Sequence, residues 1–188
     1  MKGVILAAGL GTRLYPITEN KPKHMIPIGG KPLILHLLAA LKSNGINELI
    51  LVVRHGENFT RNLLEDGGKF GLKIEYSTQE VPTGTASAVE SAEELIGEEE
   101  FLVVYGDLLL KEELIHRLLK SFEEHGEMVL AAVPVKDVSQ YGLINSRGEK
   151  LMKVEEKPEG IGGEEGNLAN AGLYVFKKKE IFKAIKRT

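Results

Sequence analysis

The stretch GVILAAGLGTRLYPITENKPK, residues 3–23, determines how this sequence is interpreted. Its first six residues, Gly3–Ala8, form an unbroken apolar run, which is typical of a strand buried on both faces of a parallel sheet. Two glycines, Gly9 and Gly11, follow at once and allow the backbone to turn tightly or to approach another group closely. The stretch therefore predicts a buried strand that opens into a tight loop.

The loop does not match the two common glycine motifs for phosphate binding. The third glycine of a dinucleotide fingerprint would fall at Leu14, and no Gly-Lys-Ser/Thr follows as it would in a Walker A loop. Pro16 and Pro22 exclude a regular helix through the loop. A helix N-terminus is therefore not the predicted anion site.

The loop nevertheless combines accessible backbone N–H groups with positive charge. The N–H groups lie around Gly9 and Gly11, Arg13 offers a two-pronged guanidinium, and Lys23 offers a mobile point charge. This combination suits a phosphate group. A glycine pair alone is equally consistent with a strand-exit turn whose charges are solvated.

Apolar runs of strand length alternate with amphipathic segments along the chain. This alternation predicts an α/β fold with a doubly wound, mostly parallel sheet. Ligands of such sheets bind beyond the carboxyl ends of the strands, so the residues directly after each run are the candidates for chemistry. The expected strands are Gly3–Ala8, Glu48–Val53, Phe101–Tyr105, Met128–Val133 and, nearer an edge, Lys73–Ser77, and the expected helices lie at residues 33–41, 58–65, 85–96 and 114–122.

The pattern changes after Val133. The segment YGLINSRGEKLMKVEEKP, residues 141–158, predicts short strands joined by a Ser-Arg-Gly turn, which we interpret as a small β insertion. The run NAGLYVF, residues 170–176, then returns to the core, and a helix is expected to begin after it. The 188 residues are expected to form one domain.

Composition excludes several classes of function. A net charge of −3 without a basic patch argues against nucleic-acid binding, and the absence of cysteine excludes disulfides and thiolate chemistry. No apolar run is long enough to span a membrane, so a cytoplasmic protein is expected. The lack of cysteine together with many lysines and glutamates is typical of a heat-adapted source. The five histidines lack metal-ligand spacing and are expected on the surface or in packing.

The motif LAAGLGTRLYPITENKPKHMIPIGGKPLI, residues 6–34, closely resembles the signature of the sugar-nucleotidyltransferase family. The resemblance continues through GTA, YGD, YG, EKP and NAG in family order. It implies a Rossmann-like fold and an enzyme that joins a nucleoside triphosphate to a sugar 1-phosphate, releasing pyrophosphate. It also implies a nucleotide-binding part at about residues 1–133 and a sugar-binding part at about residues 134–188.

The resemblance assigns the charge-handling residues of this reaction. Arg13 would clamp the leaving pyrophosphate, and Lys23 would lie near the α-phosphate and the attacking phosphate. Asp107 would bind Mg²⁺ that bridges phosphate oxygens, although an aspartate at this spacing is equally suited to cap the following helix.

The resemblance also assigns a nucleotide site. Gln79 would face the base, and because an amide can accept from N3–H and donate to a carbonyl, UTP or dTTP is favoured over GTP. Glu80 is adjacent, so a shift of one residue would reverse this argument. The implied nucleotide-binding residues are Leu6, Ala7, Ala8, Gly9, Gly11, Thr12, Gln79, Gly84 and Thr85.

The sugar is expected to be of the glucose or N-acetylglucosamine type, since Asn170 matches an asparagine that N-acetylglucosamine 1-phosphate uridylyltransferases use. Strand phase would decide whether Glu155 or Glu156 reaches the sugar. The implied sugar-binding residues are Tyr105, Gly142, Glu155, Glu156, Lys157 and Asn170.

Two alternatives stay open at this point. Mannose-1-phosphate guanylyltransferase is a close one, and a non-catalytic regulatory subunit of the same fold is a more distant one. Relatives carry a second metal ligand beyond the point where this sequence ends, and many continue into a β-helix, so a truncated domain is expected. A homo-oligomer is possible within this family.

Overall fold

A computed structural model describes residues 1–54, 57–81, 83–97, 99–136, 141–156 and 167–187. The chain divides into two compact units, Met1–Val129 with Tyr174–Thr188 (unit 1) and Leu130–Leu173 (unit 2). The first boundary lies close to the predicted change near residue 133. Tyr174–Thr188 belongs to unit 1, where helix α5 (Lys178–Ile185) contacts helix α3 (Thr85–Glu90). The division into a nucleotide-binding part and a sugar-binding part that runs to residue 188 stays a prediction.

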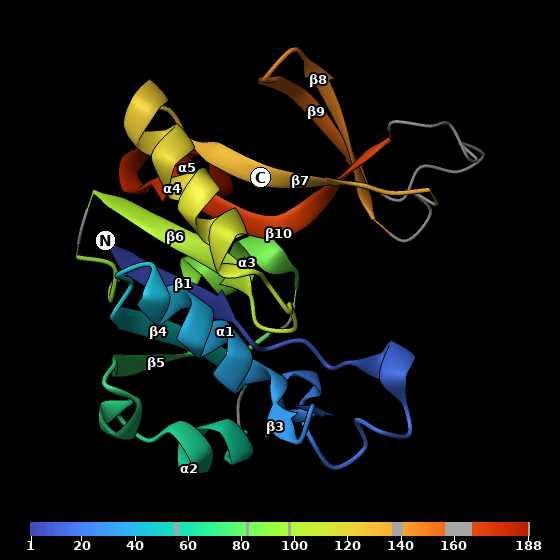
Figure 1. Cartoon of the computed structure of the whole chain (residues 1–188), viewed down its shortest axis with the longest axis vertical. Coiled ribbons are helices and arrows are strands. Elements are labelled where there is room, and N and C mark those ends of the chain that lie inside the picture. The colour runs from blue at the N-terminus through green and yellow to red at the C-terminus, as the bar shows by residue number, and fades with distance from the viewer. Residues whose placement is uncertain (55–56, 82, 98, 137–140, 157–166, 188) are drawn as a thin grey trace. The chain divides into compact units, whose positions relative to one another are not determined.

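Unit 1 is built on parallel strands in the order β5-β4-β1-β6, with the end of β10 next to β6 (Figure 1). The register places Val4 beside Ile50 on one side and Val103 on the other. Side chains at these positions are fully buried, so the core lies where the apolar runs predict it. The strands are β1 (Lys2–Leu6), β4 (Glu48–Arg54), β5 (Lys73–Gln79), β6 (Glu100–Tyr105) and β10 (Leu168–Lys177).

Helices connect these strands and cover both faces of the sheet. The connection from β1 to β4 and the connection from β5 to β6 run across the sheet in opposite directions, so right-handed crossovers place their helices on opposite faces. Helix α1 accordingly lies on the near side of the sheet in Figure 1, whereas α3 lies on the far side. The helices before α5 are α1 (Leu33–Ser43), α2 (Phe59–Leu64), α3 and α4 (Glu112–His125).

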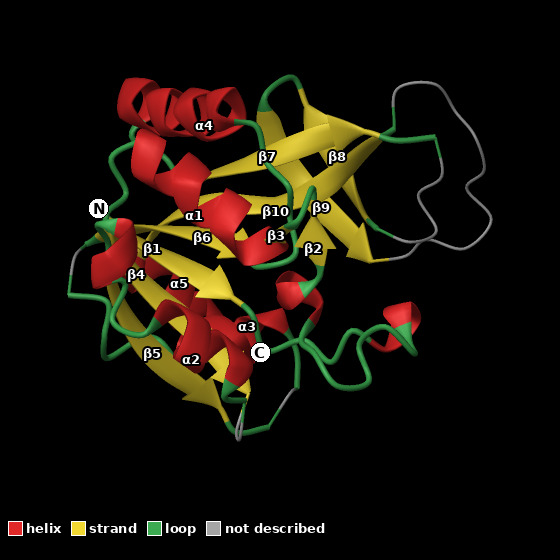
Figure 2. Ribbon diagram, turned by 60° about the horizontal axis from the view of Figure 1, so that its bottom comes forward, coloured by secondary structure: helices red, strands yellow, loops and turns green. Residues whose placement is uncertain are grey.

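The predicted helix over residues 85–96 is wrong in its second half. Helix α3 ends at Glu90 and is followed by turns up to Leu95 (Figure 2). The Ser77 hydroxyl donates to the Ser91 carbonyl, and the Ser91 hydroxyl donates to the Ala88 carbonyl. Such side-chain bonds compete with the regular helical ladder and end it early.

The long connection between β1 and α1 contains only short elements, as its prolines predict. Two 3₁₀ turns, η1 (Thr12–Leu14) and η2 (Lys23–Met25), are followed by the two-stranded pair β2 (Pro27–Ile28) and β3 (Lys31–Pro32). A third 3₁₀ turn, η3 (Gly68–Phe70), leads into β5. Among the described residues, no helix is both long and apolar enough to cross a membrane.

Unit 2 contains the predicted β insertion. Strands β8 (Gly142–Arg147) and β9 (Lys150–Glu156) form an antiparallel hairpin, and β8 also pairs with the first part of β10. Gly148 adopts a φ of 62° in the predicted turn, a conformation that favours glycine. Strand β7 (Val129–Pro134) pairs with β10, but only its Ala131 is buried, so the expectation of a fully covered strand is wrong there.

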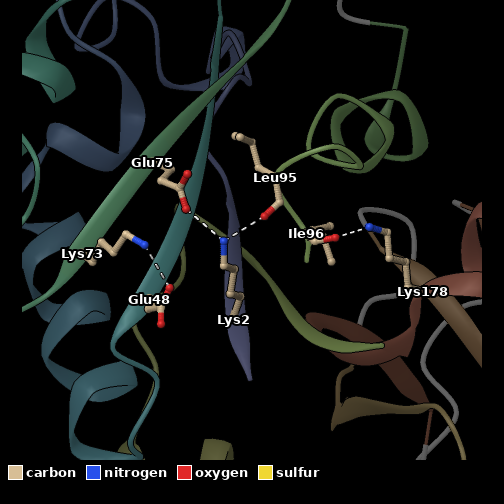
Figure 3. A network of polar contacts seen from close by, with 7 residues as sticks. All are labelled: Lys2, Glu48, Lys73, Glu75, Leu95, Ile96 and Lys178. Carbon is tan, nitrogen blue, oxygen red and sulfur yellow. Dashed lines mark hydrogen bonds and ion pairs between the residues drawn. The ribbon is translucent and has the colours of Figure 1, made fainter. Parts of the chain in front are cut away.

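A polar network ties unit 1 together beside the amino-terminal end of β1 (Figure 3). The Lys2 ammonium donates to a Glu75 carboxylate oxygen and to the Leu95 carbonyl, each at 2.9 Å. The Lys178 ammonium, from α5, donates to the next carbonyl, that of Ile96. Two lysines thus satisfy consecutive carbonyls at the end of the turns that follow α3. The hydrogen bond from Lys2 also lowers the pKa of the Glu75 carboxyl.

The Lys2 contacts predict a measurable contribution to stability. In a Lys2→Met variant the Leu95 carbonyl loses its donor, so the free energy of unfolding at pH 7 should fall by about 1–2 kcal/mol. Because Glu75 has a lowered pKa in the folded state, its share of this stability is present above its unfolded pKa and is lost on acidification. The deficit of the variant should therefore narrow below about pH 4. Urea unfolding at pH 7 and pH 3 measures both effects.

Lys73 provides a matched control for this prediction. It pairs with Glu48 at 3.4 Å, and both side chains are largely exposed (Figure 3). A Lys73→Met variant should change stability by less than about 0.5 kcal/mol, as is usual for surface pairs. Equal losses in the two variants would contradict the role assigned to Lys2.

Candidate active site

A pocket of about 380 Å³ lies at the carboxyl ends of β1, β5 and β6. Strand β1 lies between β4 and β6 in the sheet. The chain continues from β1 to β4 on one side of it, and β6, on its other side, is reached only later in the sequence. Such a switch point leaves a crevice beyond the strand ends, where ligands of α/β sheets bind. The residues that line the pocket are Leu6, Ala8, Gly9, Leu10, Gly11, Thr12, Lys23, Gln79, Gly84, Thr85, Ala88, Tyr105 and Asp107.

The two glycines of the opening loop make room for a lysine from the same loop. A Cβ atom on Gly9 would lie 3.2 Å from Lys23 Cε, and one on Gly11 would lie 3.3 Å from Lys23 Cβ and 3.0 Å from a methyl group of Thr18. Gly11 also adopts a φ of 68°, which L side chains rarely adopt. The loop is closed by the Thr18 hydroxyl, which donates to the Gly11 carbonyl at 2.9 Å. The predicted close approach is therefore made first of all by Lys23.

Lys23 and Asp107 form an ion pair at the pocket. The ammonium lies 2.5 Å from a carboxylate oxygen of Asp107, and the side chains are 24% and 32% exposed. Both groups therefore remain accessible to a ligand. Asp107 does not cap the following helix, since α4 begins at Glu112 after Lys111 and has no side-chain cap. The alternative of a capping aspartate is therefore wrong.

The neighbour of Lys23, His24, fixes the turn η2 that carries both residues. His24 is fully buried, and its Nε2 lies 2.7 Å from the Thr60 hydroxyl in the first turn of α2. The backbone N–H of Thr60 in turn donates to the buried Glu57 carboxylate at 3.0 Å. Burial lowers the pKa of His24 from 6.5 to about 4, against the raising effect of Glu57, so the ring is neutral at pH 7. This agrees with the expectation of a packing histidine.

The Gln79 side chain is held by the first turn of α3 and by Gly84, the residue directly before it. Gln79 is 7% exposed, and its amide nitrogen donates to the Gly84 carbonyl at 3.0 Å and to the Ser87 hydroxyl at 2.6 Å. Gly84 adopts a φ of 143°, a conformation that favours glycine. Of the two neighbouring residues, Gln79 lines the pocket and the exposed Glu80 does not. Gln79 is the last residue of β5, and its role toward the base stays a prediction.

Most of the predicted unit 1 residues surround one pocket, but two do not line it. Ala7 is buried, and its N–H donates to the Val52 carbonyl of β4. Arg13 lies in η1, exposed, with no hydrogen bond or ion pair to another described residue. Leu10 and Ala88 line the pocket without having been predicted. Ala88 lies four residues after Gly84 on α3, and this helical spacing is the signal that could have found it.

Tyr105 ends β6 and lines the same pocket. Its hydroxyl accepts a hydrogen bond from the Tyr174 hydroxyl at 3.2 Å, and the two rings lie 6.1 Å apart. The contact fixes Tyr105 against the last strand of unit 1.

Comparison with known proteins indicates which family this chain resembles. The family model described as nucleotidyl transferase matches residues 2–188. A glucose-1-phosphate thymidylyltransferase of Neisseria meningitidis is 34% identical over 96% of this chain. The catalytic subunit beta of a mannose-1-phosphate guanylyltransferase of Dictyostelium discoideum is 35% identical over 94% of it. A crystal structure from Bacillus anthracis, assigned as a glucose-1-phosphate thymidylyltransferase, has a TM-score of 0.87 at 30% identity, covering 97% of this chain and 73% of its own.

The chain belongs to the nucleotidyl transferase family.

This chain spans only part of its curated relatives. It covers 63% of the thymidylyltransferase from Neisseria and 49% of the guanylyltransferase subunit from Dictyostelium. These two family members use different nucleotides yet are equally similar to this chain. Overall identity therefore does not decide the base.

The predicted sugar-side residues of this nucleotidyl transferase lie mainly in unit 2. Gly142 faces Glu156 across the hairpin, and a Cβ atom on Gly142 would lie 3.1 Å from Glu156 Oε1. Glu155 faces the buried Leu143 and pairs with Lys153 at 3.1 Å. The Asn170 side-chain oxygen accepts from the Gly172 N–H at 3.1 Å. The predicted Lys157 lies outside the described residues.

The polar groups at the pocket allow a test of the expected Mg²⁺. Among the described residues, no cluster of three or more His, Asp or Glu side chains could hold a metal. Mg²⁺ commonly uses only one or two carboxylates and takes its other ligands from substrate phosphates and water. Asp107 offers one such carboxylate and already binds a cation, the Lys23 ammonium. The donor set therefore fits a metal that arrives with the nucleotide.

The lowered pKa of His24 predicts a loss of stability in mild acid. Because the pKa is about 4 in the folded state and about 6.5 when unfolded, the stabilising effect is present above pH 6.5 and is lost as the pH falls toward 4. Between pH 7 and pH 4.5 this group should account for about 2 kcal/mol of the decrease. A His24→Gln variant, which can still contact Thr60, should lose correspondingly less over this range. Urea unfolding at the two pH values provides the measurement, and parallel decreases in the two proteins would exclude His24 as the cause.

Proposed function

We propose that this chain is the catalytic core of a sugar-1-phosphate nucleotidyltransferase, which joins a nucleoside triphosphate and a sugar 1-phosphate into a nucleotide sugar and pyrophosphate. The Lys23–Asp107 ion pair carries this proposal, because it places a cation and a carboxylate beside the glycine loop at one pocket. Relatives named for this type of reaction support it.

The chemistry is an in-line displacement at the α-phosphorus. An oxygen of the sugar phosphate forms a bond to the α-phosphorus, the bond from that phosphorus to the bridging oxygen breaks, and pyrophosphate leaves with the electron pair. Two polyanions must approach each other, so the protein neutralises charge and holds the line of attack. Lys23 lies near the α-phosphate and the attacking oxygen. Arg13, which has no partner among the described residues, turns to the leaving pyrophosphate.

The glycine loop binds the triphosphate through its backbone. Its residues Ala8–Thr12 all line the pocket, and Gly9 and Gly11 among them have no side chain to cover their N–H groups. Lys23 would have to release Asp107 when phosphate arrives, and Asp107 would then hold Mg²⁺. When bound, this metal would supply charge neutralisation at the phosphate oxygens.

Gln79 reads the base, with UTP or dTTP as the favoured substrate. It lines the pocket and is nearly buried, whereas the carboxylate that would suit guanine is not at this position. GTP is the second candidate, because the guanylyltransferase subunit from Dictyostelium is 35% identical to this chain.

The sugar 1-phosphate is of the glucose or N-acetylglucosamine type. Gly142, Glu156 and Asn170 are the unit 2 residues that would contact its hydroxyl or acetamido groups, together with Lys157. Of the two glutamates, Glu156 has the better claim, because it lies against Gly142, whereas Glu155 is paired with Lys153.

A Lys23→Ala variant tests the proposed function. Pyrophosphate release is measured for this chain with UTP, dTTP, GTP and CTP against glucose, N-acetylglucosamine and mannose 1-phosphates plus Mg²⁺. The variant should lower kcat by about 100- to 1,000-fold, because it removes a preorganised charge from the transition state. Its thermal stability should change little, since both members of the ion pair are partly exposed.

Lys21→Ala is the matched control, because Lys21 is an exposed lysine of the same loop. It should leave kcat unchanged. If the wild-type chain released no pyrophosphate with any substrate pair, the proposal would be rejected for this chain. If the Lys23→Ala variant lost thermal stability along with its activity, the role of Lys23 would be structural and not catalytic.

A Gln79→Glu variant tests the choice of base. A carboxylate repels the uracil and thymine carbonyls and suits the donors of guanine, so kcat/KM for UTP and dTTP should fall by about tenfold or more relative to GTP. Glu80→Gln is the control, since Glu80 does not line the pocket, and should leave the ratio as it is. An unchanged ratio in Gln79→Glu would dismiss Gln79 as the reader of the base.

A further inference from the structure

The Gln79 amide is held by a closed set of hydrogen bonds that involves Ser87. Both hydrogens of the amide nitrogen have acceptors, the Gly84 carbonyl at 3.0 Å and the Ser87 hydroxyl at 2.6 Å. The Ser87 hydroxyl gives its own hydrogen to the same Gly84 carbonyl at 3.0 Å. Each donor of the set therefore has one acceptor.

This set determines which end of the amide faces the loop. If the amide were turned over, Gln79 Oε1 would lie about where the nitrogen now lies, 3.0 Å from the Gly84 carbonyl, and two acceptors would face each other. Ser87 cannot relieve this contact, because its single hydrogen would have to serve both oxygens. The nitrogen therefore faces the loop, and the carbonyl oxygen is the group of this side chain that is left to accept from a ligand.

The loop geometry supports the same conclusion. Gly84 adopts a φ of 143°, and a Cβ atom there would meet no atom within 4 Å, so this glycine is needed for its backbone conformation and not for space. This conformation precedes the first turn of α3, where Gly84 also accepts from the Ala88 N–H at 3.3 Å. Gly84 thus offers one carbonyl to Gln79, Ser87 and the helix at once.

We propose that Ser87 is a positioning residue that sets the base specificity of the site by holding the Gln79 amide with its oxygen toward the base. This inference rests on the proposed function. An acceptor in this position selects bases with an imino N–H, as in uracil, thymine and guanine. It disfavours cytosine, whose ring nitrogen N3 is itself an acceptor. It also corrects the role expected for Gln79, because neither amide hydrogen is free to donate to a base carbonyl. The orientation of the amide separates cytosine from the other bases and does not by itself separate uracil or thymine from guanine.

The removal of the Ser87 hydroxyl should weaken this selection. In Ser87→Ala one amide hydrogen loses its acceptor and the amide can turn away from Gly84, so that its nitrogen can donate to cytosine N3. We expect the ratio of kcat/KM for the best imino-bearing triphosphate to kcat/KM for CTP to fall by about five- to tenfold. KM for the sugar 1-phosphate should not change. The conservative Ser87→Thr variant keeps the hydroxyl and should therefore show the same ratio of kcat/KM values as the wild type.

Ser91→Ala is the matched control. Ser91 lies in the same segment and also donates from its hydroxyl to a backbone carbonyl, that of Ala88, but it makes no hydrogen bond with Gln79. It should keep the wild-type ratio even if it lowers stability. Titration calorimetry with UTP, dTTP, GTP and CTP measures the same selection at equilibrium, without turnover.

The outcomes separate this inference from the proposed function. Turnover by the wild type with an unchanged base ratio in Ser87→Ala would overturn the inference alone. A changed ratio in Ser91→Ala of the same size would also overturn it, because the effect would then belong to the segment as a whole. Wild-type protein that neither binds nor turns over any triphosphate would overturn the proposed function and, with it, this inference. Selective binding that Ser87→Ala weakens and Ser87→Thr restores would support the inference even if turnover were absent.

Discussion

The pocket of unit 1 depends on where the Lys23 ammonium can lie. A side chain at Gly9 or a different backbone conformation at Gly11 would push this lysine away from the strand ends. Asp107 attracts it from the other side, at the end of β6. The Lys23 ammonium is therefore held at the carboxyl edge of the sheet by its close packing against Gly9 and Gly11 and by the opposite charge of Asp107.

The surrounding structure supports this placement from several directions. His24 lies in the turn η2 next to Lys23, and its contact with Thr60 anchors this turn in the interior. One residue of the turn thus points into the core, whereas its neighbour Lys23 points into the pocket. The burial that makes His24 a good anchor also keeps it neutral. Across the pocket, Gln79 is held just as firmly by Gly84 and Ser87. The Gln79 amide, held in this way, needs little reorganisation when a ligand binds.

Much of the fold could be predicted because its signals are local. The apolar runs of β1, β4 and β6 are buried strands as expected, and α1 and α4 end at the glycines that follow them. Prediction failed where a distant group intervenes. Helix α3 stops early because Ser77, on another element, donates to the carbonyl of Ser91, the residue directly after the helix. The contact between α5 and α3 likewise joins distant segments, so no local pattern encodes it.

The sequence by itself determined the class of fold, the motif of the family and the identity of Gly9, Gly11, Lys23, Gln79 and Asp107 as candidates, because residue type and spacing are local properties. Only the tertiary structure decided what each of them faces. It brought Lys23 to Asp107 across 84 positions of sequence, placed Gln79 and not Glu80 in the lining of the pocket, and disclosed Ser87 as the partner of the Gln79 amide. Such contacts depend on strand phase and on hydrogen-bond direction, and both are set only when the chain folds.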